Sequence, residues 1–207
     1  MTTPDFGFIH RFVPSPSGSK TTLLLLHGTG GDENDLLGIG ESLLPGASLL
    51  SPRGKVLEGG MPRFFRRLAE GVFDLEDLKL RTHELAKFVV DACAHYKLDR
   101  DRVIAVGFSN GANIAASMML LTPQTLRGGV LMRAMVPLEP PSTPDLKGRS
   151  ALILSGEADP IVPRDQPEQL ARMLRAGGAT VDLKWQRAGH GLTQEDLRDA
   201  HGWLSQF

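Results

Sequence analysis

The sequence predicts an α/β fold, a doubly wound and mostly parallel sheet formed by one domain over residues 1–207. Two observations lead to this prediction. Short, almost continuous apolar runs alternate with segments in which apolar residues recur every three or four positions, as strands alternate with helices in such folds. A chain of 207 residues is also long enough for one well-packed core and short for two.

The apolar runs are the expected strands. Strands of a parallel sheet are covered on both faces, so they lose the alternation of apolar and polar residues. Most of the runs lead into a turn-forming stretch rich in Gly, Ser or Pro. We expect strands over residues 21–26, 47–50, 102–106, 129–132, 151–154 and 181–185.

Helices are expected between these strands. The longest, over 76–96, has a stripe at helical spacing made of Leu78, Thr82, Leu85, Val89, Cys93 and Tyr96. Further helices are expected over 110–121, from 166 to a stop at Gly177-Gly178, and from 197 to 207.

Two stretches between the helices and strands are harder to assign. The acidic cluster at 32–35 is predicted to cap the start of a helix. The Pro-rich stretch 137–144 is predicted to be a loop at the edge of the sheet and not an interdomain linker.

Charge and cysteine content narrow the function. The formal net charge of −1 produces no field that would gather nucleic acid or an anionic membrane. The single cysteine, Cys93, has no partner for an internal disulfide. Residues 1–5 lack the basic start and apolar run of a signal peptide, and the longest aliphatic run covers only 23–26. We therefore expect a cytoplasmic protein with no stable membrane association and no nucleic-acid partner.

The segment 107–111, Gly-Phe-Ser-Asn-Gly, carries the strongest functional signal. A G-x-S-x-G match is not decisive alone, but here a predicted strand precedes it and a predicted helix follows it. This context is typical of the nucleophile elbow of α/β-hydrolases, in which a strained turn exposes the serine above the sheet. We expect Gly107 and Gly111 to be required because a Cβ at either position would clash across the turn. Ser109 is thus the predicted nucleophile.

A serine nucleophile needs a histidine base and an acid that orients it, and in this fold both follow the serine in the chain. Only His190 and His201 follow Ser109. His190 lies between two glycines just past a predicted strand, whereas His201 is expected mid-helix in a half-buried structural role. Asp159, in a turn stiffened by proline, is the preferred acid, with Glu157 as the alternative.

Two backbone N–H donors are needed for the oxyanion of a tetrahedral intermediate. Asn110, directly after the serine, and Thr29, in the Gly-rich loop at 28–31, are the expected donors. That loop lacks the Gly-Lys-Ser/Thr of a phosphate-binding loop, and the acidic residues at 32–35 lack the pattern of a calcium loop. We therefore expect no metal and no cofactor. His27 is predicted to be a structural hydrogen-bonding residue.

The chain resembles the phospholipase/carboxylesterase family of small α/β-hydrolases, which includes the acyl-protein thioesterases. The matching segments follow the family's order at 26–33, 51–54, 107–111, 156–163 and 189–191. The resemblance implies an α/β-hydrolase fold, a triad of Ser109, Asp159 and His190, and oxyanion donors at Thr29 and Asn110. Homodimers are common in the family, and no feature of this sequence bears on that point.

The resemblance also bears on the substrate. Acyl-protein thioesterases typically have Gln after the serine and Leu after the first His-Gly, where this chain has Asn110 and Thr29. The pattern is closer to the bacterial esterase branch, and the absence of an inserted lid favours small substrates. We therefore expect a carboxylesterase that cleaves short-chain or small aromatic carboxylic esters, a small-molecule substrate class, through an acyl-enzyme. Thioesterase or lysophospholipase-like activity is the alternative, and a hydrolase-fold binding protein without turnover is a further one.

The segment 54–73 is too short for an inserted lid domain. Within it, Phe64 or Phe65 is a candidate wall of an acyl pocket, and Arg63 is a candidate group for attracting an anion. An amphipathic helix with a solvated basic face at 61–67 explains the same residues equally well. A cysteine nucleophile is disfavoured because Cys93 lies on the apolar stripe of a predicted helix.

Overall fold

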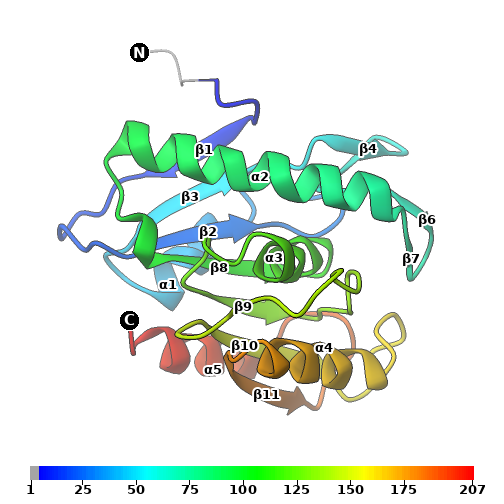
Figure 1. Cartoon of the computed structure of the whole chain (residues 1–207). Helices are drawn as coiled ribbons and strands as arrows, with labels where there is room; N and C mark the ends of the chain where they lie inside the picture. The colour runs from blue at the N-terminus through cyan, green and yellow to red at the C-terminus, as the bar shows by residue number, and fades with distance from the viewer. Residues whose placement is uncertain (1–4) are drawn as a thin grey trace.

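A computed structural model describes residues 5–207. The segment 1–5, in which the sequence shows no signal peptide, therefore lies outside the described residues except for Asp5. The main sheet contains β1 (His10–Val13), β2 (Thr22–Leu26), β3 (Ser48–Pro52), β8 (Val103–Phe108), β9 (Gly128–Met132), β10 (Ser150–Gly156) and β11 (Thr180–Gln186). The helices are α1 (Leu37–Leu43), α2 (Leu75–Tyr96), α3 (Asn110–Leu121), α4 (Asp165–Ala176) and α5 (Gln194–Leu204), with a 3-10 turn η1 (Arg100–Arg102) (Figure 1).

The sheet confirms the predicted doubly wound, mostly parallel arrangement. Its strand order is β1-β3-β2-β8-β9-β10-β11, and every neighbouring pair is parallel except β1 with β3. From β2 the chain moves outward to β3, and from β8 it moves outward in the other direction to β9, β10 and β11. The order therefore reverses between β2 and β8. Ligands bind at the carboxyl ends of the strands at such a switch point.

Helices cover both faces of the sheet, as the apolar runs predict. Residues of α2, α3 and α4 pack with Leu24 and Leu26 of β2 in one buried cluster. Residues of α1 and α5 pack with Leu23 and Leu25 in the other. Successive side chains of a strand point to opposite faces, so a four-leucine run supplies two layers of core at once. Figure 1 shows α2 lying across the near face of the sheet and α1 behind it.

The Pro-rich stretch is a loop, but its predicted place at the sheet edge is wrong. It belongs to the connection between β9 and β10, which are neighbouring parallel strands inside the sheet. Such a connection must cross a face of the sheet. Here the loop does so between α3 and α4, where the Met135 N–H donates to Asn113 (2.8 Å) and the Val136 N–H donates to Gln166 (3.3 Å).

The predicted helix cap at 32–35 is also wrong. Helix α1 begins at Leu37, and its N-cap residue Leu36 makes no side-chain cap. The acidic residues instead form a turn, in which the Asp32 carboxylate accepts the Asn34 N–H at 2.7 Å. Glu33 pairs with Arg53, with Nη2 to Oε1 at 2.8 Å. The Asp32 and Glu33 carboxylates are thus satisfied by the turn's own N–H groups and by Arg53, which directly follows β3.

No helix forms over 61–67, which excludes the amphipathic-helix interpretation. The segment after β3 makes two antiparallel hairpins, β4 (Val56–Glu58) with β5 (Met61–Arg63) and β6 (Arg67–Ala69) with β7 (Val72–Phe73). Exposed apolar side chains lie on these hairpins at Leu57, Met61, Leu68 and Val72.

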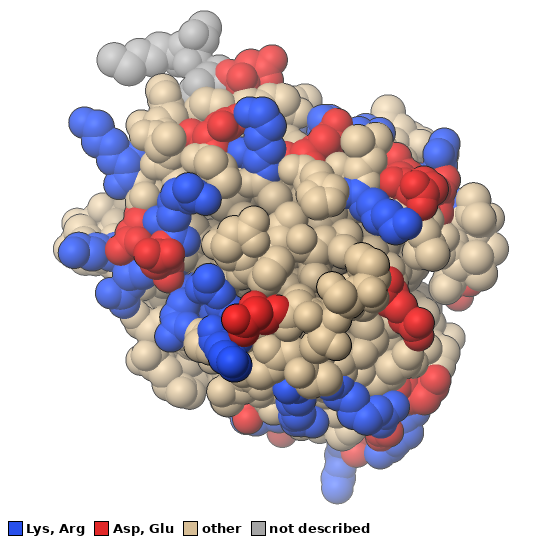
Figure 2. All heavy atoms as spheres, viewed as in Figure 1, with Lys and Arg blue, Asp and Glu red and all other residues tan. Residues whose placement is uncertain are grey.

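Charged side chains are interspersed on the surface. Figure 2 shows basic and acidic residues mixed over the face seen in Figure 1, in keeping with a formal net charge of −1. Among the helices of residues 5–207, none has the length and apolar character needed to cross a membrane.

Candidate active site

Ser109 lies on a sharp turn between β8 and α3, at the point where the strand order reverses. Its backbone has φ 52° and ψ −114°, a conformation that L-residues rarely adopt. The Ser109 N–H donates to the Met132 carbonyl of β9 at 2.9 Å, which anchors the strained residue to the sheet. As the N-cap of α3, Ser109 also lies at the positive end of that helix's dipole.

The two glycines of the turn are required, for partly different reasons than predicted. A Cβ at Gly107 would approach the Gly111 carbonyl oxygen to 2.6 Å, the expected clash across the turn. A Cβ at Gly111 would instead approach the Leu26 carbonyl oxygen to 1.9 Å. That clash is with the neighbouring strand β2, because the start of α3 lies directly against the end of β2.

The structure brings Ser109, His190 and Asp159 into one hydrogen-bonded line. The His190 Nε2 atom lies 2.9 Å from the Ser109 hydroxyl, and its Nδ1 atom lies 2.8 Å from the Asp159 Oδ2 atom. The three residues come from different parts of the chain, at the carboxyl ends of β8, β10 and β11. The Phe108 ring packs beside the imidazole, with a centroid distance of 5.5 Å.

Geometry separates the two candidate acids, Asp159 and Glu157. The Asp159 side chain is 1% exposed, and its Oδ1 atom accepts the N–H groups of Ile161 at 2.8 Å and Val162 at 3.1 Å. These bonds leave Oδ2 directed at His190. Glu157 is exposed, and its alternative role as the acid is not supported by any contact with His190. His201 lies on α5, where it bonds to the Leu43 carbonyl.

Thr29 and Asn110 both face the cavity in front of Ser109. Asn110 is the first residue of α3, so its N–H has no partner within the helix. Thr29 and Asn110 are both hydrogen-bonded by one segment, residues 63 and 64 at the end of β5. The Arg63 guanidinium donates to the Thr29 hydroxyl at 2.6 Å, and the Phe64 N–H donates to the Asn110 side-chain oxygen at 2.7 Å.

Arg63 is therefore more than the anion-attracting group that the sequence suggested. Its side chain is almost fully buried. While a terminal nitrogen binds Thr29, the Nε atom lies 3.2 Å from the Phe65 carbonyl and 3.2 Å from the Glu58 carboxylate. Burial and the neighbouring Arg67 lower the pKa of Arg63 from its ordinary value. It lines the cavity, and its Nε and Nη1 atoms are engaged by Phe65, Glu58 and Thr29.

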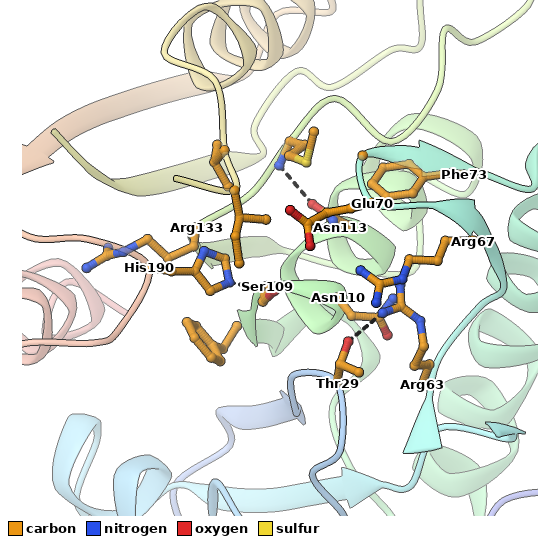
Figure 3. A pocket seen from close by; sticks show the side chains of 15 residues that line it. Thr29, Arg63, Arg67, Glu70, Phe73, Ser109, Asn110, Asn113, Arg133 and His190 are labelled. Carbon is orange, nitrogen blue, oxygen red and sulfur yellow. Dashed lines mark hydrogen bonds between the residues drawn. The ribbon is translucent and has the colours of Figure 1, made fainter. Parts of the chain in front are cut away.

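A cavity of about 270 Å³ lies in front of Ser109 (Figure 3). Its lining is mixed: Arg67, Glu70 and Asn113 are polar, and Phe73, Met135, Ile161 and Val162 are apolar. The expectation that Phe64 or Phe65 walls the pocket is wrong. Both are core residues, 2% and 0% exposed, and Phe73 of β7 lines the cavity instead.

Sequence reasoning missed several lining residues. Arg67, Glu70 and Phe73 lie on a hairpin that no strand pattern indicated, and Asn113 lies on the first turn of an otherwise apolar helix. A polar residue one turn after the serine was the available signal for Asn113. Arg133 was also missed, although it directly follows an apolar run. Cys93 is buried on α2, and burial raises the pKa of its thiol to about 11, which counts against a cysteine nucleophile.

His27 has the structural role expected from the sequence. It is 2% exposed, its Nδ1 atom lies 2.6 Å from the Gly28 carbonyl, and its Nε2 atom accepts the Gly54 N–H at 2.9 Å. Accepting at Nε2 requires a neutral ring protonated at Nδ1. Burial lowers the pKa of His27 below 6.5, despite opposition from the nearby carboxylates of Asp32 and Asp35.

A pH dependence follows from this histidine. Burial disfavours the protonated form of His27, so the unfolded chain takes up a proton more readily than the folded protein does. The contribution of His27 to stability is therefore complete above pH 6.5 and is lost as the pH falls below it. Replacing His27 by Gln removes the titration. We expect the free energy of unfolding of the parent to fall, relative to H27Q, by up to about 1.4 kcal/mol per pH unit below 6.5. Urea titrations at pH 5 and 7.5 measure this; a constant difference between the two proteins would contradict it.

Comparisons with known proteins agree with this architecture. The family model described as Phospholipase/Carboxylesterase matches residues 10–207. The chain is 48% identical to MhqD of Bacillus subtilis (strain 168) over 188 residues, covering 91% of this chain and 94% of that protein. The crystal structure of a Bacillus cereus carboxylesterase superposes with a TM-score of 0.95 at 46% identity, covering 98% and 95% of the two chains. A carboxylesterase from Mesorhizobium loti superposes with a TM-score of 0.92 at 31% identity, covering 98% and 97%.

Proposed function

The chain belongs to the phospholipase/carboxylesterase family, and from this membership we propose that it hydrolyses small carboxylic esters through an acyl-enzyme on Ser109. The observation that carries the proposal is the hydrogen-bonded line from Ser109 through His190 to Asp159, which opens onto a cavity. A serine hydroxyl, an imidazole and a buried carboxylate in this order are the parts that acyl transfer requires.

The proposed reaction follows from these contacts. His190 Nε2 takes the proton of the Ser109 hydroxyl as the oxygen attacks the ester carbonyl. Asp159 holds the Nδ1–H of the imidazole, which keeps Nε2 free to accept and stabilises the imidazolium. The N–H groups of Thr29 and Asn110 stabilise the oxyanion. His190 then protonates the leaving alcohol, and water, activated by the same imidazole, releases the acid from Ser109.

The cavity supports small acyl groups. Its volume of about 270 Å³ lies just below the range of typical ligand pockets, roughly 300–1,000 Å³. Charged residues, among them Arg67 and Glu70, line part of the cavity, and burying a long acyl chain against such polar groups is unfavourable. This composition favours short-chain or small aromatic esters over the lipid chains of thioesterase or lysophospholipase substrates. The presence of a nucleophile, base, acid and oxyanion donors in one site counts against a binding protein without turnover.

Pre-steady-state kinetics with p-nitrophenyl esters tests the proposal. We expect a burst of p-nitrophenol equal to the enzyme concentration, and a fluorophosphonate adduct on the peptide that contains Ser109. Across acetate, butyrate and octanoate, kcat/KM for the best short ester is expected to exceed that for octanoate by about tenfold or more. An acyl thioester of matched chain length is measured alongside.

The outcomes separate the alternatives. A preference for octanoate or for the thioester would favour the thioesterase or lysophospholipase alternative. Absence of both burst and adduct in a folded protein would overturn the proposal and favour a non-catalytic binding role.

A further inference from the structure

Arg133 is a buried cation next to the site that the reaction above does not use. It follows β9 directly, its side chain is 0% exposed, and its backbone has a φ of 60°, in the left-handed region that favours glycine. Retaining a long charged side chain there is costly, both for the backbone and for the desolvated charge. Such a residue requires a specific set of partners.

All five guanidinium N–H groups of Arg133 have acceptors. Two go to Asp196 of α5, from Nη1 to Oδ1 at 2.8 Å and from Nη2 to Oδ2 at 2.7 Å. A third goes from Nη1 to the Leu154 carbonyl of β10 at 3.2 Å. The remaining two go to the carbonyls of Gly189, from Nε at 3.1 Å, and Gly191, from Nη2 at 2.8 Å.

Gly189 and Gly191 are the residues on either side of His190. Glycine has no side chain to restrict its backbone, so a Gly-His-Gly loop does not by itself hold an imidazole in one direction. Arg133 bonds to both flanking carbonyls and so restrains the loop on each side of the histidine. Figure 3 shows Arg133 beside His190, across the site from Arg63 and Arg67.

The same segment also reaches the other members of the site. The Met132 carbonyl accepts the Ser109 N–H at 2.9 Å, and the Arg133 N–H donates to the Leu154 carbonyl at 2.8 Å. The end of β9 thus bonds to the serine turn, to the strand that leads to Asp159, and to the histidine loop. Asp196 is held in turn by the capping box with Thr193 at the start of α5.

We propose that Arg133, backed by Asp196, is a positioning residue that orients His190 toward Ser109 by clamping the carbonyls of Gly189 and Gly191. The proposal rests on the proposed function, since it assumes that His190 is the base. A purely structural role for the Arg133–Asp196 pair makes a different prediction, because it would change the fraction of folded enzyme and not the chemistry of each folded site.

Arg133→Lys is the sharpest test. Lysine keeps the charge that Asp196 requires, but its single ammonium lacks the planar fork that reaches two carbonyls at once. Activity is measured per active site, titrated with a fluorophosphonate, on p-nitrophenyl acetate and on ethyl acetate. We expect kcat/KM for p-nitrophenyl acetate to fall about 10- to 100-fold, as misplacement of a catalytic group by about 1 Å does.

The loss is expected to be several-fold larger for ethyl acetate. Ethoxide is a poor leaving group that needs a proton from the imidazole, whereas p-nitrophenolate leaves with little help. Arg81→Lys is the matched control, since Arg81 pairs with Asp77 and Glu84 on α2 and does not line the cavity, and we expect it to leave both rates unchanged. If Arg133→Lys does not fold, Arg133→Met combined with Asp196→Leu removes the clamp without stranding a buried charge.

The outcomes are distinct. Unchanged kcat/KM per titrated site, or an equal loss on both esters, would overturn the positioning role while leaving the esterase proposal intact. Full activity of Ser109→Ala would instead overturn the proposed function itself. A larger loss on ethyl acetate in a folded Arg133→Lys protein supports the inference.

Discussion

Replacing Ser109 by alanine is expected to lower kcat for p-nitrophenyl acetate by about 10⁴-fold or more. Among residues 5–207, the Ser109 hydroxyl is the only hydrogen-bond partner of the His190 Nε2 atom, since Asp159 is bound by Nδ1. Without it, only the oxyanion donors and the cavity remain, and they assist attack by water weakly. Steady-state rates corrected for spontaneous hydrolysis measure this change.

Ser109→Gly is the matched variant. Both replacements remove the hydroxyl, but only glycine relieves the strain of a φ of 52°. We expect the glycine protein to be equally inactive and more stable than the alanine protein by about 1 kcal/mol in urea unfolding. Equal stability of the two variants would show that the turn stores no strain at this residue. Activity retained in either would exclude Ser109 as the nucleophile.

Gly111→Ala is expected to cause the largest loss of stability, above about 3 kcal/mol, or failure to fold. The new Cβ would lie 1.9 Å from the Leu26 carbonyl oxygen, 2.4 Å from its carbon and 2.6 Å from the His27 carbonyl oxygen. All three are backbone atoms at the end of a central strand, so no side chain is able to move aside. The helix start and β2 would have to separate, and Thr29 would shift with the strand end.

Gly202→Ala is its control. Gly202 is also helical, on α5, but a Cβ there meets nothing within 4 Å. Alanine is favoured over glycine in a helix interior by about 1 kcal/mol, so this variant is expected to be as stable as the parent or slightly more stable. Thermal unfolding of the two variants side by side distinguishes a local clash from a general sensitivity of helical glycines. A folded Gly111→Ala protein with the parent's melting temperature would contradict the close packing of α3 on β2.

The strands of the main sheet are predictable from the sequence, whereas the strands of the hairpins are not. The strands at 21–26 and 102–106 were found because continuous apolar runs have few uses other than a strand buried on both faces. The hairpins over 56–73 escaped prediction because their strands are two or three residues long, too short to show any period. Phe64 and Phe65 were misplaced for the same reason, since which face of a short hairpin packs inward depends on its docking.

The candidate site also has residues that the sequence reveals and contacts that only the structure reveals. Ser109 and His190 stand out in the sequence because each lies in a glycine-flanked turn after an apolar run, and chain order reduces the candidate bases to two. The choice of Asp159 over Glu157 rested on a proline-stiffened turn, and the structure adds the two backbone N–H groups that aim its carboxylate.

Local patterns in the sequence are enough to predict the α/β fold, the strained serine turn and the order of the chemical groups, because period, turn chemistry and chain order act over a few residues. The partners of Arg133, by contrast, lie 21 to 63 positions away, at Leu154, Gly189, Gly191 and Asp196. Arg63 likewise holds Thr29 across 34 positions. No local pattern encodes such pairs. They arise because the packing of separate strands places a buried cation where only these acceptors are available, and that packing determines how the reactive groups are held.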